Sequence, residues 1–347
     1  MKALVLEDYM NLVYKEVPKP MPSDGEVLIR VEACGICGSD VHGMDGSTGR
    51  RIPPIIMGHE AAGVIEETGP GVQGWNPGDR VTFDSTIYPL DDWYTLRGRY
   101  NLSDNRMVLG VSTPEYRRDG AYAEYVTVPA HVLYPIPDAV RFEEAAMVEP
   151  AAVAMHAVNL ARLDLQDTVL VIGAGMVGLL LVQILRRSNA GTIIAVDIDD
   201  RRLAMAREFG ADHTYDARMP HLADAVLGLS GGRGADVVFE VVGKSETVDR
   251  AVHLVRKGGT VMLVGNTSPR IDLALQVVVT RELRIQGSCA IRGEYEQVLK
   301  RMASGSLEVQ PLISAAVPLS EGAGWFDKLY SKSENLNKVI LCPGMRP

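Results

Sequence analysis

The stretch from Thr168 to Asp197 constrains the fold of this chain more than any other. It opens with Thr-Val-Leu-Val-Ile, a short run of β-branched and apolar residues. Such a run is too short for a helix and is typical of a strand that is buried on both faces. Three glycines follow at once, Gly173, Gly175 and Gly178, in the spacing G-x-G-x-x-G. The stretch therefore predicts a strand that ends in a glycine-rich turn.

The spacing of these glycines predicts a dinucleotide-binding turn. The first glycine allows a tight bend, the second lets a pyrophosphate approach the backbone, and the third lets the following helix pack closely on the strand. Met176 and Val177 lie where a helix over residues 177–187 begins, and a helix N-terminus binds phosphates, so both are candidate cofactor-binding residues with the glycines. A second strand over residues 192–196 completes a βαβ unit.

Asp197 follows this second strand, at the position where an acid binds a ribose 2′-hydroxyl. Its carboxylate would face the 2′-phosphate of NADP, and such a like-charge contact costs several kcal/mol when it is desolvated. The predicted cofactor is therefore NAD. Arg202, with its neighbour Arg201, is close enough in sequence to contact a cofactor phosphate, or else belongs to the solvated face of the next helix.

A second concentration of functional residue types lies in glycine-rich loops between residues 34 and 60. Thiolate, imidazole and carboxylate are the ligands of zinc, and three protein ligands with one open position define a catalytic site. Cys37, His59 and a glutamate fit this set. The C-x-x-C spacing of Cys34 and Cys37 also allows a redox pair or half of a structural zinc knuckle, but no second C-x-x-C and no thioredoxin-like helix follow.

The composition is that of an ordinary globular chain with length for two domains, since 46% of its 347 residues are hydrophobic and 23% are charged. The net charge of −9 argues against nucleic acid as a partner, because binding its backbone needs a basic surface. No apolar run reaches the ~18 residues of a membrane span, and the N-terminus becomes acidic before a secretory segment could form. Four cysteines are too few for a disulfide scaffold, so we expect a cytoplasmic protein that binds no membrane.

The order of the predicted elements indicates a β-rich domain that is interrupted by a domain of alternating strands and helices. A short helix over 142–147 precedes Val148-Glu149-Pro150, and a helix over 151–163 leads into the alternating part, which predicts a parallel sheet. The later elements predict a return to the first domain: a helix near 295–302, a β-like segment over 310–317 and a last strand over 338–342. The predicted domains are residues 1–155, 156–287 and 288–347, the first and last forming one domain.

Four motifs occur in the chain in this order: Cys37-Gly-Ser39-Asp40-x-His42, Gly58-His59-Glu60, Val148-Glu149-Pro150 and the glycine-rich turn. Together they resemble the zinc-dependent medium-chain dehydrogenases, and Gly98-Arg-Tyr-Asn-Leu-Ser103 resembles the sorbitol-type, or polyol, branch of that family. The resemblance implies a GroES-like β-rich catalytic domain into which a Rossmann domain with a doubly wound parallel sheet is inserted. It also implies zinc in the cleft between the domains. The expected assembly is a homo-oligomer, either a dimer or a homotetramer.

The resemblance assigns a role to each residue of the first three motifs. Cys37 and His59 would bind zinc together with Glu60 or Glu149, which the sequence leaves as alternatives. Asp40 would orient His59, while Ser39 and His42 would relay the substrate proton, although His42 also reads as an ordinary surface residue. Zinc lowers the pKa of a bound alcohol, and imidazole accepts protons near neutral pH, so the set suits alcohol oxidation.

Departures from the family pattern refine these expectations. Many relatives carry four cysteines around a structural zinc in the segment that corresponds to residues 84–106, but this chain has none there, so we expect one catalytic zinc and a segment held by aromatic packing and salt bridges. Polyol relatives tend to carry an aromatic residue where this chain has Gly43, and an Arg-aromatic pair where it has Cys289-Ala290-Ile291. We therefore expect an opened pocket that suits a bulkier or cyclic substrate better than sorbitol.

The predicted function is the reversible oxidation of a secondary alcohol of a polyol or sugar alcohol to a ketone, with NAD as the hydride acceptor. Within the family, the alternative is a dehydrogenase that acts on threonine or a butanediol. Outside the enzymes, the alternative is a dinucleotide-binding module that has lost its metal, which the intact set of candidate ligands argues against.

Overall fold

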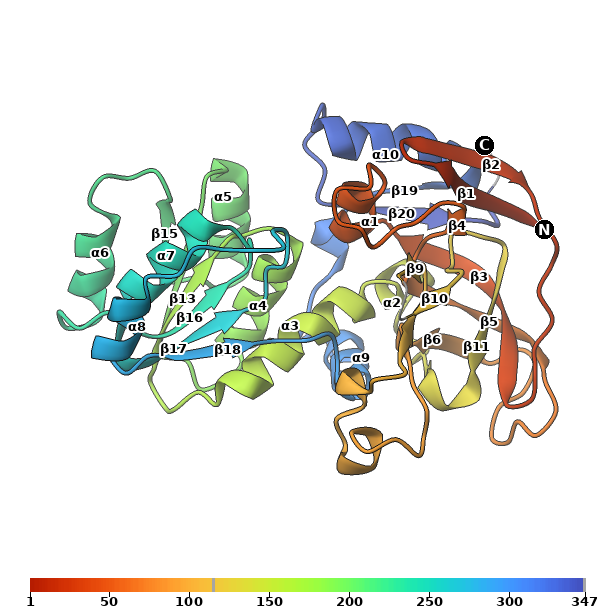
Figure 1. Cartoon of the computed structure of the whole chain (residues 1–347), viewed down its shortest axis with the longest axis horizontal. Coiled ribbons are helices and arrows are strands. Elements are labelled where there is room, and N and C mark those ends of the chain that lie inside the picture. The colour runs from red at the N-terminus through yellow and green to blue at the C-terminus, as the bar shows by residue number, and fades with distance from the viewer. Residues whose placement is uncertain (114–115, 346–347) are drawn as a thin grey trace. The chain divides into compact units, whose positions relative to one another are not determined.

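The computed structural model describes residues 1–113 and 116–345, which form two compact units (Figure 1). The first unit is built from two separate parts of the chain, residues 1–152 and the segment from Ile291 onward. The second unit contains residues 153–290. The second unit therefore interrupts the first in sequence order.

The second unit contains a six-stranded sheet in which all neighbouring strands are parallel. Its strands are β13 (Thr168–Ile172), β14 (Thr192–Asp197), β15 (His213–Asp216), β16 (Ala235–Glu240), β17 (Val255–Leu263) and β18 (Arg284–Gly287). The order β15-β14-β13-β16-β17-β18 is the doubly wound order, in which the chain runs from the centre to one edge and then returns to build the other. Every position of β13 is buried, as expected for a strand covered on both faces.

The helices that alternate with these strands along the sequence pack on the sheet. They are α4 (Met176–Arg186), α5 (Asp200–Glu208), α6 (Leu222–Leu229), α7 (Ser245–Leu254) and α8 (Leu275–Thr280), and α3 (Val148–Ala161) leads into the unit. Helix α4 contacts β13 and β14, α5 contacts β14 and β15, and α7 contacts β16 and β17. None of the helices in residues 1–113 and 116–345 has both the length and the hydropathy that a membrane span requires.

The first unit is mainly β-structure around one large apolar core. Its main sheet has the order β12-β6-β5-β3-β20-β19, with β11 also paired to β3, and a smaller sheet has the order β2-β1-β4. The strands of these sheets are β1 (Lys2–Asp8), β2 (Asn11–Glu16), β3 (Glu26–Gly35), β4 (Ile55–Ile56), β5 (Glu60–Thr68), β6 (Arg80–Phe83), β11 (Tyr125–Pro129), β12 (Leu133–Pro135), β19 (Ile313–Pro318) and β20 (Lys338–Cys342). Four two-residue strands form two further small sheets: β7 (Thr86–Ile87) with β8 (Met107–Val108), and β9 (Val111–Ser112) with β10 (Arg117–Arg118).

The last part of the chain adds to the sheet that the first part begins. Strand β20 pairs antiparallel with β3, where Ile340 lies opposite Gly35 and Leu341 opposite Cys34. The α-helices of the first unit outside α3 are α1 (Gly38–Gly43), α2 (Phe142–Ala145), α9 (Tyr295–Ala303) and α10 (Gly322–Ser331). The pairing brings the start of β20 next to the loop that carries the first candidate metal ligand.

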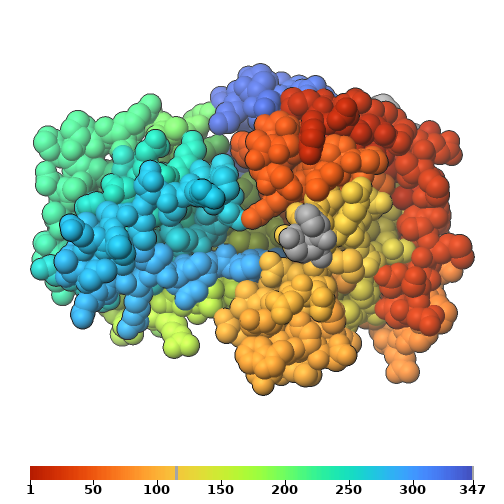
Figure 2. Space-filling model, in the orientation of Figure 1, coloured from red at the N-terminus to blue at the C-terminus, as the bar shows by residue number. Residues whose placement is uncertain are grey.

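Residues 84–106 form a lobe on the surface of the first unit, drawn in light orange in Figure 2. The ring of Tyr88 stacks on that of Tyr100 with the centroids 4.1 Å apart. The Tyr100 hydroxyl donates a hydrogen bond of 2.6 Å to Asp84, whose carboxyl is buried. Burial raises the pKa of Asp84 to about 6. Aromatic stacking and a partly buried hydrogen bond thus join residues at the two ends of this segment.

Some predicted boundaries are wrong. Helix α3 begins at Val148 and not at residue 151, so that Glu149 and Pro150 lie in its first turn. Proline is tolerated there because the first N–H groups of a helix have no partner within the helix. The predicted strand over 310–317 begins with a turn of 3₁₀-helix over Gln310–Leu312 and becomes extended only at Ile313.

Candidate active site

Cys37 lies between the end of β3 and the start of α1. It is the N-cap residue of that helix, with an extended backbone, and its sulfur accepts a hydrogen bond from the Ser39 N–H at 3.4 Å. The Ser39 hydroxyl donates a second hydrogen bond to the same sulfur at 3.2 Å. The two hydrogen bonds from Ser39 therefore fix the position of the sulfur at the start of α1.

Two glycines shape the backbone around His59 and Glu60. Gly58 has a φ of +99°, and a Cβ there would come within 2.7 Å of the Tyr122 ring. Gly35 lies opposite Glu60 in the β3–β5 register, and a Cβ on Gly35 would come within 2.4 Å of a Glu60 carboxylate oxygen. The absence of a side chain at Gly35 therefore lets the Glu60 carboxylate lie against the backbone of β3.

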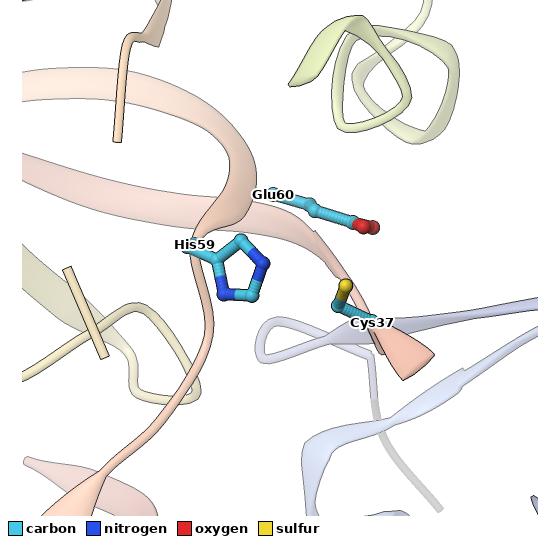
Figure 3. A group of neighbouring side chains, drawn as sticks. All are labelled: Cys37, His59 and Glu60. Atoms are coloured by element: carbon cyan, nitrogen blue, oxygen red, sulfur yellow. The ribbon is translucent and has the colours of Figure 1, made fainter. Parts of the chain in front are cut away.

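The structure brings the predicted ligands Cys37, His59 and Glu60 together. One ligand atom from each lies within 4.8 Å of the other two, and Figure 3 shows the three side chains turned toward one another. His59 and Glu60 are buried, and Cys37 is partly buried. A sulfur, an imidazole nitrogen and a carboxylate oxygen at such separations form a donor set suited to zinc.

The electrostatics of the cluster fit a bound cation. Burial, together with the charge of Glu60, raises the pKa of Cys37 to about 12, although Lys338 acts in the opposite direction. Burial also raises the pKa of Glu149 to about 8, and Glu60 and Cys37 add to this rise while His59 opposes it. Groups that disfavour each other's negative charge in a buried place would be stabilised by a divalent cation, which reverses these shifts.

Glu149 lies near the cluster without being part of its tightest set. Within the described part of the chain, the group of ligand atoms that all lie within 4.8 Å of one another contains Glu60 and not Glu149. Glu149 is nevertheless close enough for its carboxyl to respond to the charges of Cys37, His59 and Glu60. Its place in the first turn of α3 makes it a carboxylate that approaches the same site from another element.

Lys338 is a residue of this site that the sequence did not indicate. Its ammonium group forms an ion pair with the Glu60 carboxylate, and the side chains of Lys338 and Glu60 are only 3% and 1% exposed. The ammonium also donates to the Ile36 carbonyl at 3.1 Å. Glu60 is therefore already partnered by a buried cation, whereas Glu149 has no ion pair among those of the described residues.

Asp40 is fully buried behind His59. Its Oδ2 lies 3.5 Å from His59 Nδ1 and accepts a hydrogen bond of 2.8 Å from the Tyr122 hydroxyl. Its Oδ1 accepts a hydrogen bond of 2.8 Å from Arg51 Nε. Burial alone would raise the pKa of the Asp40 carboxyl, but Arg51 and His59 hold it below its usual range. An ionised Asp40 facing Nδ1 leaves Nε2 of His59 for a metal, which suits the orienting role predicted for it.

Ser39 and His42 differ in how closely they approach the cluster. Ser39 is exposed and lies at its edge through the contact with the Cys37 sulfur. His42, at the end of α1, is also exposed, and no hydrogen bond between described residues joins its ring to Ser39. The relay through His42 stays a prediction.

In the second unit, the three glycines of the turn occupy positions that differ in steric demand. Gly173 has a φ of +100°, and a Cβ on Gly178 would lie 1.9 Å from the Gly173 carbonyl oxygen. A Cβ on Gly175 would meet nothing within 4 Å. The first and third glycines are thus needed for the turn and its contact with α4, while the second faces open space. Met176 and Val177 form the partly exposed first turn of α4.

The turn lies at the centre of the sheet, where the strand order reverses. Strand β13 pairs with β14 on one side and β16 on the other, and ligands of doubly wound sheets bind beyond the strand ends at such a switch point. Asp197, at the end of β14, accepts hydrogen bonds from the N–H groups of Ala174 at 2.7 Å, Ile198 at 2.8 Å and Asp199 at 3.0 Å. The predicted ribose ligand therefore also holds the turn. Arg202 Nη1 lies 3.9 Å from the Asp197 carboxylate.

Known proteins share these features. The family model of the alcohol dehydrogenase GroES-like domain matches residues 23–138, and that of the zinc-binding dehydrogenase matches residues 176–304. The chain is 35% identical over 338 residues to the uncharacterized zinc-type alcohol dehydrogenase-like protein YdjJ of Escherichia coli, covering 96% of this chain and 95% of that protein. It is 33% identical over 350 residues to sorbitol dehydrogenase 1 of Saccharomyces cerevisiae, covering 98% and 97% of the two chains. A protein of Sinorhizobium meliloti 1021, assigned as a zinc-binding dehydrogenase and solved with NADP bound, aligns with a TM-score of 0.89 and 32% identity over 99% of both chains.

The chain therefore belongs to the zinc-dependent medium-chain alcohol dehydrogenases and is similar to their polyol dehydrogenases. It is an enzyme whose chemistry uses zinc and a nicotinamide dinucleotide. The predicted family, the predicted enzyme class and the predicted Rossmann sheet within a GroES-like fold are confirmed.

Proposed function

We propose that the enzyme reversibly oxidises a secondary alcohol of a polyol or sugar alcohol to a ketone and transfers the hydride to NAD. The observation that carries this proposal is the meeting of one ligand atom each from Cys37, His59 and Glu60 within 4.8 Å, because a site of this donor set with an open position activates alcohols. The similarity to yeast sorbitol dehydrogenase 1 supports a polyhydroxylated substrate.

Cys37 and His59 would hold the zinc together with one carboxylate. When bound, zinc supplies Lewis-acid chemistry that lowers the pKa of the substrate hydroxyl. A metal would have to compete with Lys338 for the Glu60 carboxylate. Glu149 has no such partner in the part of the chain that the structure describes, and its pKa of about 8 means that a nearby cation would favour its ionised form near neutral pH. We infer that Glu149 serves as the ligand while Lys338 holds Glu60, and that Glu60 serves when the ion pair opens.

The proton of the substrate hydroxyl would leave through Ser39 and His42. Ser39 Oγ lies 3.2 Å from the Cys37 sulfur, at the edge of the site, and would take up the substrate proton while its own hydrogen turns from the sulfur and leaves toward His42. The exposed imidazole of His42 would pass the proton on to solvent, because one ring nitrogen can accept a proton while the other releases one. Asp40 keeps Nδ1 of His59 turned away from the metal position throughout.

We propose one zinc per chain. The lobe of residues 84–106 contains no cysteine, and a partly buried hydrogen bond between Tyr100 and Asp84 stabilises it. The same role is filled in many relatives by a structural zinc, as the resemblance implied. A second metal would find no thiolate ligands in this segment.

We propose NAD as the preferred dinucleotide. A carboxylate accepts about four hydrogen bonds, and backbone N–H groups occupy three of those sites on Asp197, which leaves one for a ribose hydroxyl. A 2′-phosphate at the same place would meet the negative charge. Arg202, at 3.9 Å, offsets part of that charge, and the Sinorhizobium relative was solved with NADP, so the ratio of the two activities is the quantity to measure.

We further propose a homo-oligomer, either a dimer or a homotetramer, in the cytoplasm. The family resemblance supports the assembly. Cys34, Cys37, Cys289 and Cys342 form no disulfide with one another, as expected in a reducing compartment.

The test combines metal analysis with a substrate screen. Plasma mass spectrometry of the purified enzyme should give about one zinc per chain, and NADH formation should be greatest with a polyhydroxylated secondary alcohol among polyols, sugar alcohol phosphates, inositols, diols and threonine. Cys37→Ser should abolish both zinc and activity, while Cys342→Ser, at a buried cysteine outside the cluster, should retain both. Reaction with primary alcohols alone would remove the polyol assignment, and reaction with threonine or butanediol alone would establish the alternative. A chain without zinc or activity would be a dinucleotide-binding module.

A further inference from the structure

Arg51 is a buried arginine in the loop between α1 and β4. Its side chain is only 3% exposed, whereas its sequence neighbour Arg50 is exposed. Burying a guanidinium is costly unless its charge and its N–H donors find partners. The structure supplies such partners for each of its three nitrogen atoms.

The guanidinium joins two residues that face the candidate metal ligands. Nε donates to Asp40 Oδ1 at 2.8 Å, and Nη2 lies 2.6 Å from the same oxygen. Nη2 also donates to the Ser39 hydroxyl oxygen at 3.2 Å, while Nη1 donates to the Arg50 carbonyl at 3.1 Å. One rigid side chain therefore holds both Asp40 and Ser39.

Each side-chain partner of Arg51 contacts one of the candidate metal ligands. Asp40 faces His59 Nδ1 at 3.5 Å, and the Ser39 hydroxyl donates to the Cys37 sulfur at 3.2 Å. Because the Ser39 oxygen accepts from Arg51, its own hydrogen is directed to the sulfur. The arginine thus reaches the imidazole and the sulfur through one intermediary each.

Gly43 provides the space for this side chain. It is buried in α1, and a Cβ on it would lie 2.6 Å from Arg51 Cγ and 3.5 Å from Arg51 Cβ. A side chain at this position would displace the stem of Arg51. The room that the sequence led us to expect beside Gly43 is therefore filled by Arg51, and the prediction of a pocket opened for substrate at this point is wrong.

We propose that Arg51 is a positioning residue of the zinc site, which fixes the Asp40 carboxylate and the Ser39 hydroxyl together, and that Gly43 is required because it admits Arg51. The planar fork of arginine is suited to this task, whereas lysine would bring the same charge as a single point without the fork. The inference rests on the proposed zinc site at Cys37 and His59. It adds a support that reaches two ligands at once.

The test uses two variants that keep a positive charge in the loop. Arg51→Lys retains the charge and loses the fork, and Gly43→Ala retains Arg51 and displaces its stem. Gly324→Ala is the matched control, since this helical glycine of the same unit has nothing within 4 Å of a Cβ. Zinc affinity is measured by competition with a chromogenic chelator, alongside the melting temperature of the metal-free proteins and the visible spectrum of the cobalt-substituted proteins.

Loss of such outer support typically weakens metal binding by about 10–100-fold, and we expect this loss in both variants and not in the control. An altered cobalt spectrum in the folded variants would agree. Zinc affinity within about twofold of the unaltered enzyme, with only a lowered melting temperature, would make Arg51 a purely structural residue and overturn the inference. If the unaltered enzyme itself bound no zinc, the proposed function would fail first and the inference with it, which separates the two failures. Should Arg51→Lys not fold, Gly43→Ala decides the outcome.

Discussion

Replacing Lys338 by methionine tests whether the buried ion pair with Glu60 stabilises the metal-free protein by neutralising the Glu60 carboxylate. The substitution keeps most of the length of the side chain and removes its charge, which leaves the Glu60 carboxylate, 1% exposed, without its cation. Removing one partner of a buried pair typically destabilises a protein by about 3–5 kcal/mol. In a domain of about 150–250 residues each kcal/mol lowers the melting temperature by about 2–4 °C, so the metal-free variant should melt about 6–20 °C below the unaltered protein.

Zinc should restore much of this loss, because a bound divalent cation gives Glu60 a new partner. The expected result is therefore a larger rise of the melting temperature on adding zinc to Lys338→Met than to the unaltered enzyme. Differential scanning fluorimetry with a chelator and with zinc measures both quantities. Lys300→Met is the matched control, since its ion pair with Glu296 is exposed to solvent, and exposed pairs add little to stability.

Two results would refute this reasoning. A metal-free Lys338→Met protein that melts within about 2 °C of the unaltered protein would show that the pair is not needed to bury Glu60. An equal loss of stability with and without zinc would show that Glu60 does not approach the metal.

Three further predictions concern the cofactor turn and proton exchange. Gly178→Ala should lower the melting temperature, because its Cβ would lie 1.9 Å from a backbone oxygen. Gly175→Ala should fold normally, since its Cβ enters open space. It should nevertheless weaken NADH binding, measured by fluorescence titration, because the pyrophosphate would lie in that space. The unaltered enzyme should have a higher kcat/KM with NAD than with NADP, and Asp197→Ala should narrow or reverse the difference while also loosening the turn; equal use of both cofactors by the unaltered enzyme would contradict this. Zinc uptake should release protons into a weakly buffered dye solution, since burial raises the pKa of Cys37 to about 12 and that of Glu149 to about 8 and both must deprotonate to bind. Zinc affinity should therefore rise with pH, more steeply below about 8, where both groups carry protons, than above it, where only Cys37 does; an affinity independent of pH would count against these ligands.

The parts of the fold that were predictable from the sequence are those that local spacing determines. The strand before Gly173, the helix after Gly175 and the parallel sheet follow from short-range patterns and were found as expected. Cys37, His59 and Glu60 were named because their residue types and loops suit zinc, and pairing of neighbouring strands β3 and β5 brings them together.

Two supporting residues of the site, Lys338 and Arg51, were not predictable in this way. Lys338 is separated from Glu60 by 278 positions, and a lysine at the start of a strand gives no sign of burial. Arg51 is preceded by Arg50, and only the tertiary structure distinguishes the buried arginine from the exposed one. Asp197 was expected to serve a ligand, and its bonds to the turn became visible only with the backbone in place. Whether two distant charged residues form a pair depends on how the sheet assembles. Local residue spacing does not reveal that assembly.

The position of Lys338 on β20 also has a consequence for how this enzyme is synthesised and how it can be divided. A growing chain contains Cys37, His59 and Glu60 early, but the ammonium group that Glu60 requires in its buried place is translated only after the whole second unit. A fragment that ends before β20 would keep every candidate metal ligand but lack both this counter-charge and the strand that pairs with β3, so its metal-free site should be less stable than that of the whole chain. To obtain the first unit alone, residues 1–152 would have to be joined directly to the segment from Ile291 onward, with the second unit removed from between them.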